Sequence, residues 1–221
     1  MDSVEQAVGY MAFHLEALGR QTKINTILDI GAAHGHFSHM AQRIWPDVRV
    51  TAVECNPRDK KYLEDTNWAV HYACLGDKEC KKTFYVNPLE LEGGGSSFYI
   101  ENTTHFDNCI EEEMDIITLD SLDLLPHDLI KIDTQGSELD IMKGGEKTLA
   151  NARFLLLELS YIDFNQGAPL IDDILAYTRE QGFRMIDVFG PQFGGHWWQG
   201  RKTQADVLLA KEDEDVFNFR G

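Results

Sequence analysis

TILDIGAAHGHFSHMA, residues 26–41, is the stretch of sequence that determines the fold. A short apolar run ends in Asp29, and the two glycines Gly31 and Gly35 follow it, four residues apart. Glycine is favoured where the backbone must adopt a positive φ or lie close to a ligand. In open α/β sheets, ligands bind beyond the carboxyl ends of the strands. The stretch therefore predicts a buried strand, a ligand-binding turn and a helix that begins near Gly35.

The same alternation continues along the chain, as apolar segments separated by segments with helical periodicity. Strands that are apolar along their whole length are usually covered on both faces of a parallel sheet. The sequence therefore predicts one α/β domain over residues 1–221, with a doubly wound, mostly parallel, seven-stranded sheet. The expected strands are 26–30, 48–53, 69–75, 128–133, 153–159, 183–189 and 205–210, and the expected helices are 3–18, 35–45, 57–65, 137–150 and 170–181.

Three segments depart from this alternation. Residues 1–22 contain an amphipathic helix that precedes the first strand. Residues 76–127 predict a β insertion, with extra strands at 81–87 and 113–119. Residues 211–221 form an acidic tail, which we expect to fray because chain ends are poorly ordered unless something holds them.

Composition excludes several classes of partner. The chain has 20 Lys and Arg against 37 Asp and Glu, so its formal net charge is −17. Such a surface repels phosphate backbones and anionic lipid, so we expect neither nucleic acid nor a membrane as partner. No apolar run reaches the roughly 18 residues of a membrane span. The N-terminal segment lacks the basic start of a signal peptide, which favours a cytoplasmic location.

The four cysteines are Cys55, Cys74, Cys80 and Cys109, and none of them forms a C-x-x-C pair. Without that spacing and without a secretory signal, the sequence predicts free thiols in a reducing compartment.

The kind of ligand follows from what surrounds the glycine turn. A dinucleotide site needs G-x-G-x-x-G, but Ala33 occupies the position of the middle glycine, and no lysine follows that would make a phosphate-binding P-loop. Glu54 ends the second strand, where an acidic side chain accepts hydrogen bonds from ribose hydroxyls. Asp77, after Gly76, is placed to meet an adenine amino group. Ribose and adenine without pyrophosphate indicate S-adenosylmethionine.

Longer motifs add a resemblance to this prediction. DIGAAHGHF (29–37) and VECNP (53–57) resemble the first two motifs of class I S-adenosylmethionine-dependent methyltransferases. LDSL (119–122), DLIKIDTQGSELDIMKGG (128–145) and LLLELS (155–160) resemble the FkbM family of methyltransferases. The resemblance covers roughly residues 24–210, with Met142 and the pair Thr134-Gln135 as small departures. It implies O-methylation of a small molecule or a glycan, with S-adenosylmethionine as cofactor.

The expected cofactor contacts follow from these motifs and from the strand ends. They are Asp29, Gly31, Ala32, Gly35, Phe37, Glu54, Cys55, Asn56, Gly76, Asp77 and Asp133. For Asp77, a turn aspartate after glycine would give the same pattern.

Four residues are candidates for catalysis: Asp133, Glu138, Glu158 and His34. Asp133 and Glu158 end strands at the expected cleft, and a lone glutamate within LLLELS needs a specific partner. Glu138 either approaches the same cleft or complements the dipole at a helix start. His34 is a candidate general base, as are His36, His105 and His196, because histidine ordinarily titrates close to working pH; a surface histidine is the alternative for each. We expect no metal, although the three carboxylates have the oxygen ligands of a divalent cation.

Two other functions fit parts of the sequence. One is a protein that binds S-adenosylmethionine without turnover, and the other is a nicotinamide-dependent oxidoreductase, which the missing middle glycine disfavours. Trp197-Trp198 in a loop is suited either to a sugar face or to a lid packed on the core. The sequence leaves the methyl acceptor and the oligomeric state open.

Overall fold

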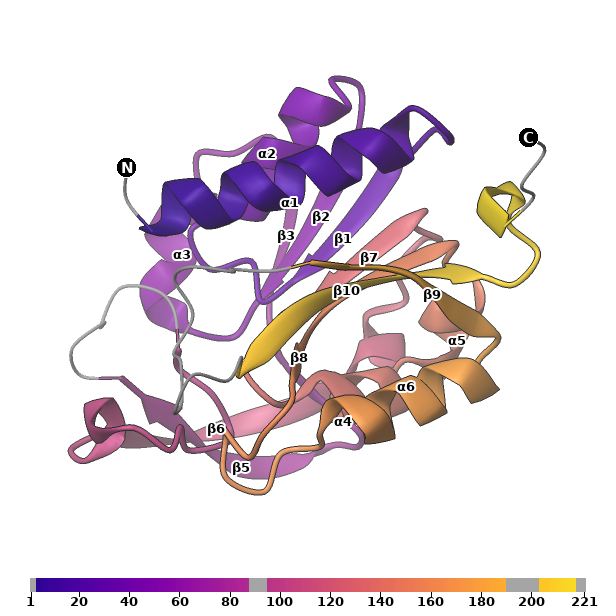
Figure 1. Cartoon of the computed structure of the whole chain (residues 1–221). Coiled ribbons are helices and arrows are strands. Elements are labelled where there is room, and N and C mark those ends of the chain that lie inside the picture. Colours follow the sequence, from indigo (N-terminus) through magenta and orange to yellow (C-terminus); the bar gives the residue numbers. More distant parts are fainter. Residues whose placement is uncertain (1–2, 88–94, 190–202, 218–221) are drawn as a thin grey trace.

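A computed structural model of the chain describes residues 3–87, 95–189 and 203–217 (Figure 1). A seven-stranded sheet in the order β3-β2-β1-β7-β8-β10-β9 forms its centre, as predicted. The first five of these strands run parallel, and β10 is antiparallel to both of its neighbours. The strands are β1 Thr26–Ile30, β2 Arg49–Glu54, β3 Ala69–Tyr72, β7 Leu129–Ile132, β8 Phe154–Ser160, β9 Phe183–Phe189 and β10 Gln204–Lys211.

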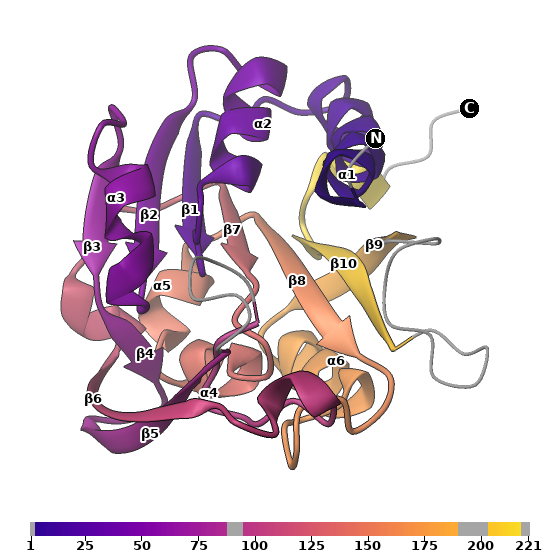
Figure 2. The same ribbon diagram turned by 90° about the vertical axis from the view of Figure 1, so that its left-hand side faces the viewer.

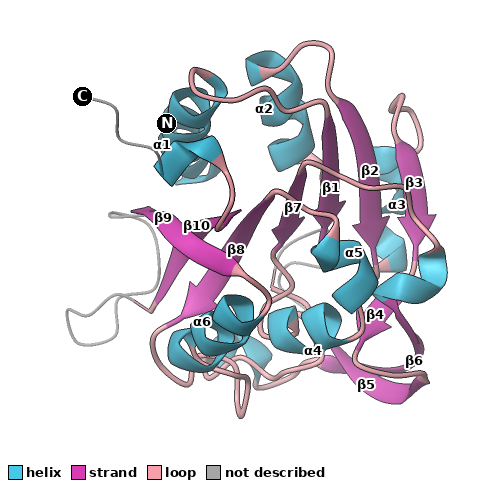
Figure 3. Ribbon diagram, turned by 90° about the vertical axis from the view of Figure 1, so that its right-hand side faces the viewer, coloured by secondary structure: helices cyan, strands magenta, loops and turns pink. Residues whose placement is uncertain are grey.

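Helices cover both faces of this sheet (Figures 1 and 3). On one face lie α1 Ser3–Gly19, α2 His36–Ile44 and α3 Lys60–Leu63, the last preceded by a 3₁₀ turn, Pro57–Asp59. On the other lie α4 Glu138–Lys143, α5 Glu146–Ala150 and α6 Ile171–Glu180. Successive residues of a strand face opposite sides, so Ile27 packs under α1 and α2 while Leu28 packs under the other layer. This explains why the central strands are apolar along their whole length.

The predicted β insertion is a separate three-stranded sheet in the order β4-β6-β5 (Figure 2). Its strands are β4 Cys74–Gly76, β5 Cys80–Val86 and β6 Ile110–Thr118. The single strand expected over 69–75 is therefore two strands, β3 in the large sheet and β4 in the small one.

The helix expected over 137–150 is also divided in two, at Gly144 and Gly145. A Cβ atom on Gly144 would lie 2.0 Å from the carbonyl oxygen of Gly76, and the carbonyl of Gly144 accepts the N–H of Asp120 at 3.0 Å. The break therefore lets the small sheet pack directly against the backbone of this helical segment.

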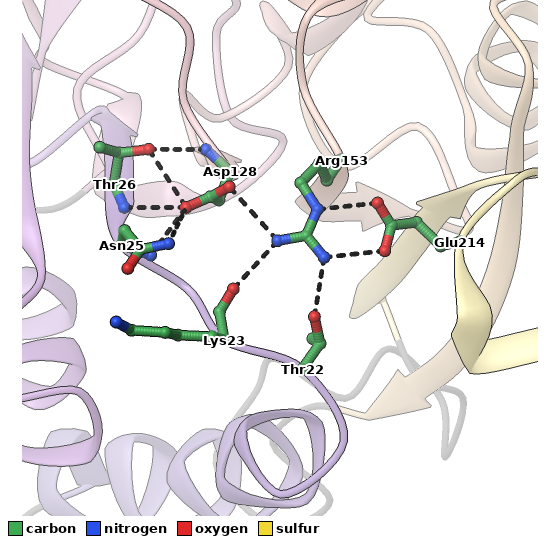
Figure 4. Close-up of polar contacts among 7 residues, drawn as sticks. All are labelled: Thr22, Lys23, Asn25, Thr26, Asp128, Arg153 and Glu214. Atoms are coloured by element: carbon green, nitrogen blue, oxygen red, sulfur yellow. Dashed lines mark hydrogen bonds and ion pairs between the residues drawn. The ribbon is translucent and has the colours of Figure 1, made fainter.

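The C-terminal segment is held at the amino-terminal edge of the sheet (Figure 4). Arg153 at the start of β8 donates to both carboxylate oxygens of Glu214, at 2.8 and 2.9 Å, and approaches Asp128 at 3.3 Å. Beyond it, the guanidinium of Arg184 lies 4.5 Å from the ring centroid of Phe217. The expectation that the tail frays from residue 211 is therefore wrong as far as residue 217, and residues 218–221 lie outside the described part.

The prediction of four free thiols is wrong for two of them. Cys55 and Cys74 form a disulfide, and Cys80 and Cys109 are free and partly buried. The two bonded cysteines follow the end of β2 and begin β4, and the N–H of Ala73 bonds the carbonyl of Glu54 at 3.0 Å. Strand pairing thus brings together two positions 19 residues apart, and it removes the free-thiol support for a cytoplasmic location. In the described residues, no helix has the length and apolar character required to cross a membrane.

Candidate functional site

A cavity of about 180 Å³ lies at the carboxyl ends of β1, β2 and β7; we call it the central cavity. Of the residues predicted to contact a cofactor, five line it: Gly31, Glu54, Cys55, Asn56 and Asp133. The small sheet and the loop between β5 and β6 supply an apolar part of the lining, with Leu75, Phe84 and Phe98. The rings of Phe84 and Phe98 lie 5.0 Å apart. The central cavity therefore combines a polar strand edge with an apolar wall.

Glu54 is the best-defined polar group of the central cavity. Its Oε2 accepts the N–H of Ala33 and its Oε1 accepts the N–H of Asn56, both at 2.7 Å. The side chain is nearly buried, and burial raises its pKa to about 7 against the opposing effect of those two hydrogen bonds. Each carboxylate oxygen has further acceptor capacity. The carboxylate is thus fixed in one orientation and can still accept from two neighbouring hydroxyls.

The glycine turn is shaped by its protein neighbours. Gly31 has φ +78°, and a Cβ atom there would lie 2.0 Å from the carbonyl oxygen of Asp133. Gly35 has φ +76°, and its Cβ would lie 2.7 Å from the ring of Trp68. Gly31 lines the central cavity, whereas Gly35 and Ala32 do not. Both glycines are therefore required by close packing as well as by their backbone conformation.

Asp29 lies beneath this turn and is fully buried. Its Oδ2 accepts a 2.6 Å hydrogen bond from Ser38 of α2, and its Oδ1 lies 3.8 Å from Nζ of Lys131. Burial raises the pKa of Asp29, opposed by Lys131 and Ser38. Asp29 does not line the central cavity, and neither does Phe37, whose ring centroid lies 5.4 Å from the Lys131 ammonium. Both residues organise the turn and α2 from below.

Lys131, to which the sequence analysis gave no role, is the buried cation of the site. Its Nζ lies 3.0 Å from Oδ2 of Asp133. Burial lowers its pKa, but the carboxylates of Asp133 and Asp29 outweigh burial, so the net shift is upward. Asp133 lines the central cavity and also accepts from Nε2 of Gln135 at 3.2 Å. The sequence feature that could have identified Lys131 is the segment IKID (130–133), in which a lysine and an aspartate alternate with isoleucines at the end of a buried strand.

Glu138 does not line the central cavity, and of the two alternatives in the sequence analysis its position in the first turn of α4 matches the one at a helix start. It is buried, and its carboxylate accepts from the N–H of Thr134 at 2.9 Å and the N–H of Gly136 at 3.0 Å. In this turn, Gln135 and Gly136 have positive φ values of 56° and 108°. Burial raises the pKa of Glu138. The residue therefore braces the turn that carries Gln135, and a catalytic role for it remains only a sequence prediction.

Glu158 lies at the same edge of the sheet, on β8, but it does not line the central cavity, and it is paired with a residue that the sequence analysis missed. Its Oε2 accepts from Gln135 at 2.7 Å and from Gln204 at 3.2 Å. In the antiparallel register of β8 and β10, Glu158 lies directly opposite Asp206. Burial and then Asp133 raise the pKa of both carboxyls, that of Asp206 to about 7. The sequence feature that could have identified Asp206 is that it is the single acid in the otherwise apolar segment ADVLLA (205–210).

His34 and the pair Gly76-Asp77 lie away from the central cavity lining. His34 packs on Tyr62 with ring centroids 3.9 Å apart, and its Nε2 lies 3.4 Å from Asp59, which does line the cavity. Gly76 packs beneath Gly144, and Asp77 lies 3.9 Å from Lys78. The predicted adenine contact of Asp77 is thus not matched by its position, because Leu75 and Phe84 form that wall.

Some predictions fall on parts that the structure leaves undescribed. His196 and Trp197-Trp198 lie outside the described residues, and so does the side chain of His105. His36 is described, and its ring centroid lies 5.6 Å from that of His34. In the part of the chain that is described, no group of three or more His, Cys, Asp or Glu side chains is placed to hold a metal ion.

Comparisons with known proteins agree with the fold and indicate the family. A sequence model described as the methyltransferase FkbM domain matches residues 29–185. Magnesium protoporphyrin IX methyltransferase (ChlM) from Synechocystis PCC 6803, solved with bound SAM, has a similar fold. It is 13% identical, the match covers 95% of this chain and 80% of that chain, and the TM-score is 0.52.

A S-adenosylmethionine-dependent methyltransferase from Clostridium acetobutylicum ATCC 824 is 8% identical over 90% of this chain and 89% of its own, with a TM-score of 0.51. A methyltransferase FkbM from Methylobacillus flagellatus KT is 16% identical over 83% of this chain, with a TM-score of 0.49. The present chain spans 43% of the length of that structure. No curated protein matches the chain.

Proposed function

Because the chain belongs to the FkbM methyltransferase family, we propose that it transfers a methyl group from S-adenosylmethionine to a hydroxyl group of a small molecule or sugar. The observation that carries this proposal is the joint position of Glu54 and Asp133 on one cavity at the carboxyl edge of the sheet. When bound, the cofactor supplies a methyl group activated on a sulfonium, so the protein contributes mainly alignment and exclusion of water.

The residues of the central cavity fit this cofactor. The carboxylate of Glu54, held by two backbone N–H groups, is suited to accept from the two ribose hydroxyls. The apolar side chains of Leu75, Phe84 and Phe98 are suited to the faces of an adenine ring. Gly31 and Asp133 then remain for the methionine end, with Lys131 holding the Asp133 carboxylate in place. Asp29 and Phe37 do not line the central cavity; they hold the glycine turn and α2 that position these cofactor contacts.

The acceptor is proposed from the charge and chemistry of the site edge. Asp133 and Glu158 present hydrogen-bond acceptors, which suits a molecule rich in hydroxyl groups. The net charge of −17 disfavours nucleic acid and anionic membranes as partners. A small molecule or glycan is therefore the proposed acceptor.

The rival functions make different predictions. A binding protein without turnover would bind S-adenosylmethionine and release no methyl group. A nicotinamide-dependent oxidoreductase would bind NAD, for which Ala33 replaces the glycine that lets a pyrophosphate approach.

One pair of experiments tests the proposal. Calorimetric titrations with S-adenosylmethionine, S-adenosylhomocysteine and NAD are combined with a methyl-transfer assay on a panel of alcohols and methyl glycosides. We expect binding of the first two ligands, no binding of NAD, and transfer to at least one hydroxyl acceptor. Binding of NAD in preference to S-adenosylmethionine would contradict the proposal.

A further inference from the structure

Three neighbouring strands each present a carboxylate at the carboxyl edge of the large sheet. Ile132 of β7 pairs with Leu157 of β8, which places Asp133 beside Glu158, and Glu158 pairs in turn with Asp206 of β10. We call Asp133, Glu158 and Asp206 the acid row. Adjacent strands lie about 4.8 Å apart, so the row extends roughly 10 Å from the central cavity. This length suits a sugar ring or a molecule of similar size.

The three carboxylates are not equally satisfied. Asp133 is held by Lys131 at 3.0 Å and by Gln135 at 3.2 Å. Glu158 receives the amides of Gln135 and Gln204. Asp206 is only 7% exposed, yet it accepts no hydrogen bond from any residue in the described part of the chain. A buried polar group without a partner is costly, so Asp206 is the member of the row that lacks a donor.

The pairing of Asp206 with Glu158 also requires a proton or a ligand. Like charges directly opposite each other on neighbouring strands are destabilising, and burial increases the cost. The charged side chains that act on the pair are Asp133, directly after β7, and Lys131 on β7. On the neighbouring β9, Asp187 is engaged by His14 of α1 at 2.6 Å. A donor from the acceptor molecule would satisfy Asp206 directly.

We propose that Asp206, held opposite Glu158, is the general base that takes the proton from the acceptor hydroxyl. This inference rests on the proposed function. In the step, the acceptor oxygen forms its bond to the methyl carbon, and the sulfur keeps the electron pair of the broken C–S bond. The hydroxyl proton moves to a carboxylate oxygen of Asp206, from which it later passes to solvent.

The environments of the other two acids make them poorer bases. Asp133 has both carboxylate oxygens occupied, Oδ2 by the ammonium of Lys131 and Oδ1 by the amide of Gln135. Glu158 has its Oε2 occupied by two amides, so it acts as a positioning residue beside Asp206. A general base is most effective when its pKa lies near the working pH. Burial, followed by Asp133, raises the pKa of Asp206 to about 7, which meets that condition.

The first test needs no acceptor. Infrared difference spectra of the whole chain are recorded while the pH is raised from about 5 to about 9, which lies above the ordinary pKa range of carboxyl groups. We expect carbonyl absorption of protonated carboxylic acids that disappears near neutral pH, with one component from Glu54 and a second component that is absent in Asp206→Asn. The control variant Asp115→Asn, at an exposed position of β6, should leave both components unchanged. Absence of any band that depends on Asp206 overturns the proposal.

The second test measures methyl transfer to methyl glycosides and benzyl alcohol. Asp206→Asn should lower kcat by about 10²-fold or more, the usual contribution of a general base, while the Kd for S-adenosylmethionine stays unchanged. The residual rate of Asp206→Asn should rise steadily with pH, and Asp206→Glu should restore part of the activity. A kcat for Asp206→Asn within about threefold of wild type overturns the proposal, because general-base catalysis contributes far more. Failure of the proposed function is distinct: the wild type then methylates none of these hydroxyl probes, whatever the infrared spectra show.

Discussion

The backbone N–H of Ala33 lies 2.7 Å from Oε2 of Glu54, and this hydrogen bond joins the turn after β1 to the end of β2. With the matching bond from Asn56, it fixes the Glu54 carboxylate before any ligand arrives. A prepositioned acceptor loses little conformational entropy on binding, so most of its hydrogen-bond energy contributes to affinity.

The affinity for S-adenosylmethionine should rise with pH around neutrality. Burial raises the pKa of Glu54 to about 7, and only its charged form offers both oxygens as acceptors to the two ribose hydroxyls. Below that pKa one carboxyl oxygen carries a proton and accepts more weakly, so affinity increases as the pH rises through the pKa. Calorimetric Kd values across this range check the prediction. Glu54→Gln should bind about tenfold more weakly, a loss of about 1.4 kcal/mol, and without this pH dependence. Equal pH dependence in both proteins would contradict the assignment.

The same raised pKa of Glu54 should make the free energy of unfolding fall as the pH rises, whereas the affinity for S-adenosylmethionine rises. Between the unfolded value of 4.5 and about 7, the folded protein binds the Glu54 proton more tightly than the unfolded chain does. The contribution of Glu54 to the free energy of unfolding is therefore fully present below the unfolded pKa, and it is lost as the pH rises through the folded pKa. Urea unfolding of wild type and Glu54→Gln at several pH values measures this, and the difference between the two should change over that window.

Gly31→Ala should destabilise the fold beyond the usual cost of a left-handed alanine. The new Cβ would lie 2.0 Å from the Asp133 carbonyl, so β1 and β7 would have to separate. Gly182 is a matched control, because its φ is also +78° but nothing lies within 4 Å of its Cβ position. Gly182→Ala should cost about 1–2 kcal/mol of unfolding free energy. A Gly31→Ala cost no larger than that would show that the turn can relax.

Reduction of the Cys55–Cys74 disulfide should lower the free energy of unfolding. The bridge closes a loop of 19 residues, for which chain entropy predicts a loss of about 3 kcal/mol. Cys55→Ser combined with Cys74→Ser should reproduce the effect of reductant and be insensitive to it. Cys80→Ser is the control, since Cys80 is free. Unfolding curves that are identical with and without reductant would contradict the prediction.

Arg153 and Glu214 should show measurable coupling in a double-mutant cycle. Their contact is bidentate and partly buried, so we expect a coupling energy of about 1–2 kcal/mol from the variants Arg153→Met and Glu214→Gln. The pair Arg179–Glu212 provides the comparison, because it lies at 3.7 Å with both side chains exposed. That pair should couple by less than about 0.5 kcal/mol. Similar values for the two pairs would show that Glu214 does not hold the C-terminal segment.

The sequence alone can identify functional residues that lie at the end of a strand, because an apolar run shows where the strand ends. The apolar runs predicted all seven strands of the large sheet, and Glu54 and Asp133 could be placed on the cavity because each closes such a run. The glycine turn was also located correctly, although Gly35 meets Trp68 and does not line the central cavity.

Contacts between distant segments could not be predicted in the same way. The Cys55–Cys74 bond and the break at Gly144 both depend on where the small sheet packs. Asp206 gains its importance from its register with Glu158, 48 residues earlier, as shown by the pairing of β10 with β8. Glu138 turns toward its own loop because that loop has unsatisfied N–H groups, which no helical pattern reveals.

Phe84 of β5 forms part of the apolar wall of the central cavity, so substitutions along β5 should be tolerated unequally. Phe84 and Val86 point inward and are buried, while Lys81 and Thr83 on the same strand are exposed. In a library of all single substitutions selected for function, tolerance along β5 should therefore alternate with every second residue. The small sheet would then diverge freely on its outer face while its inner face stays constrained by the ligand.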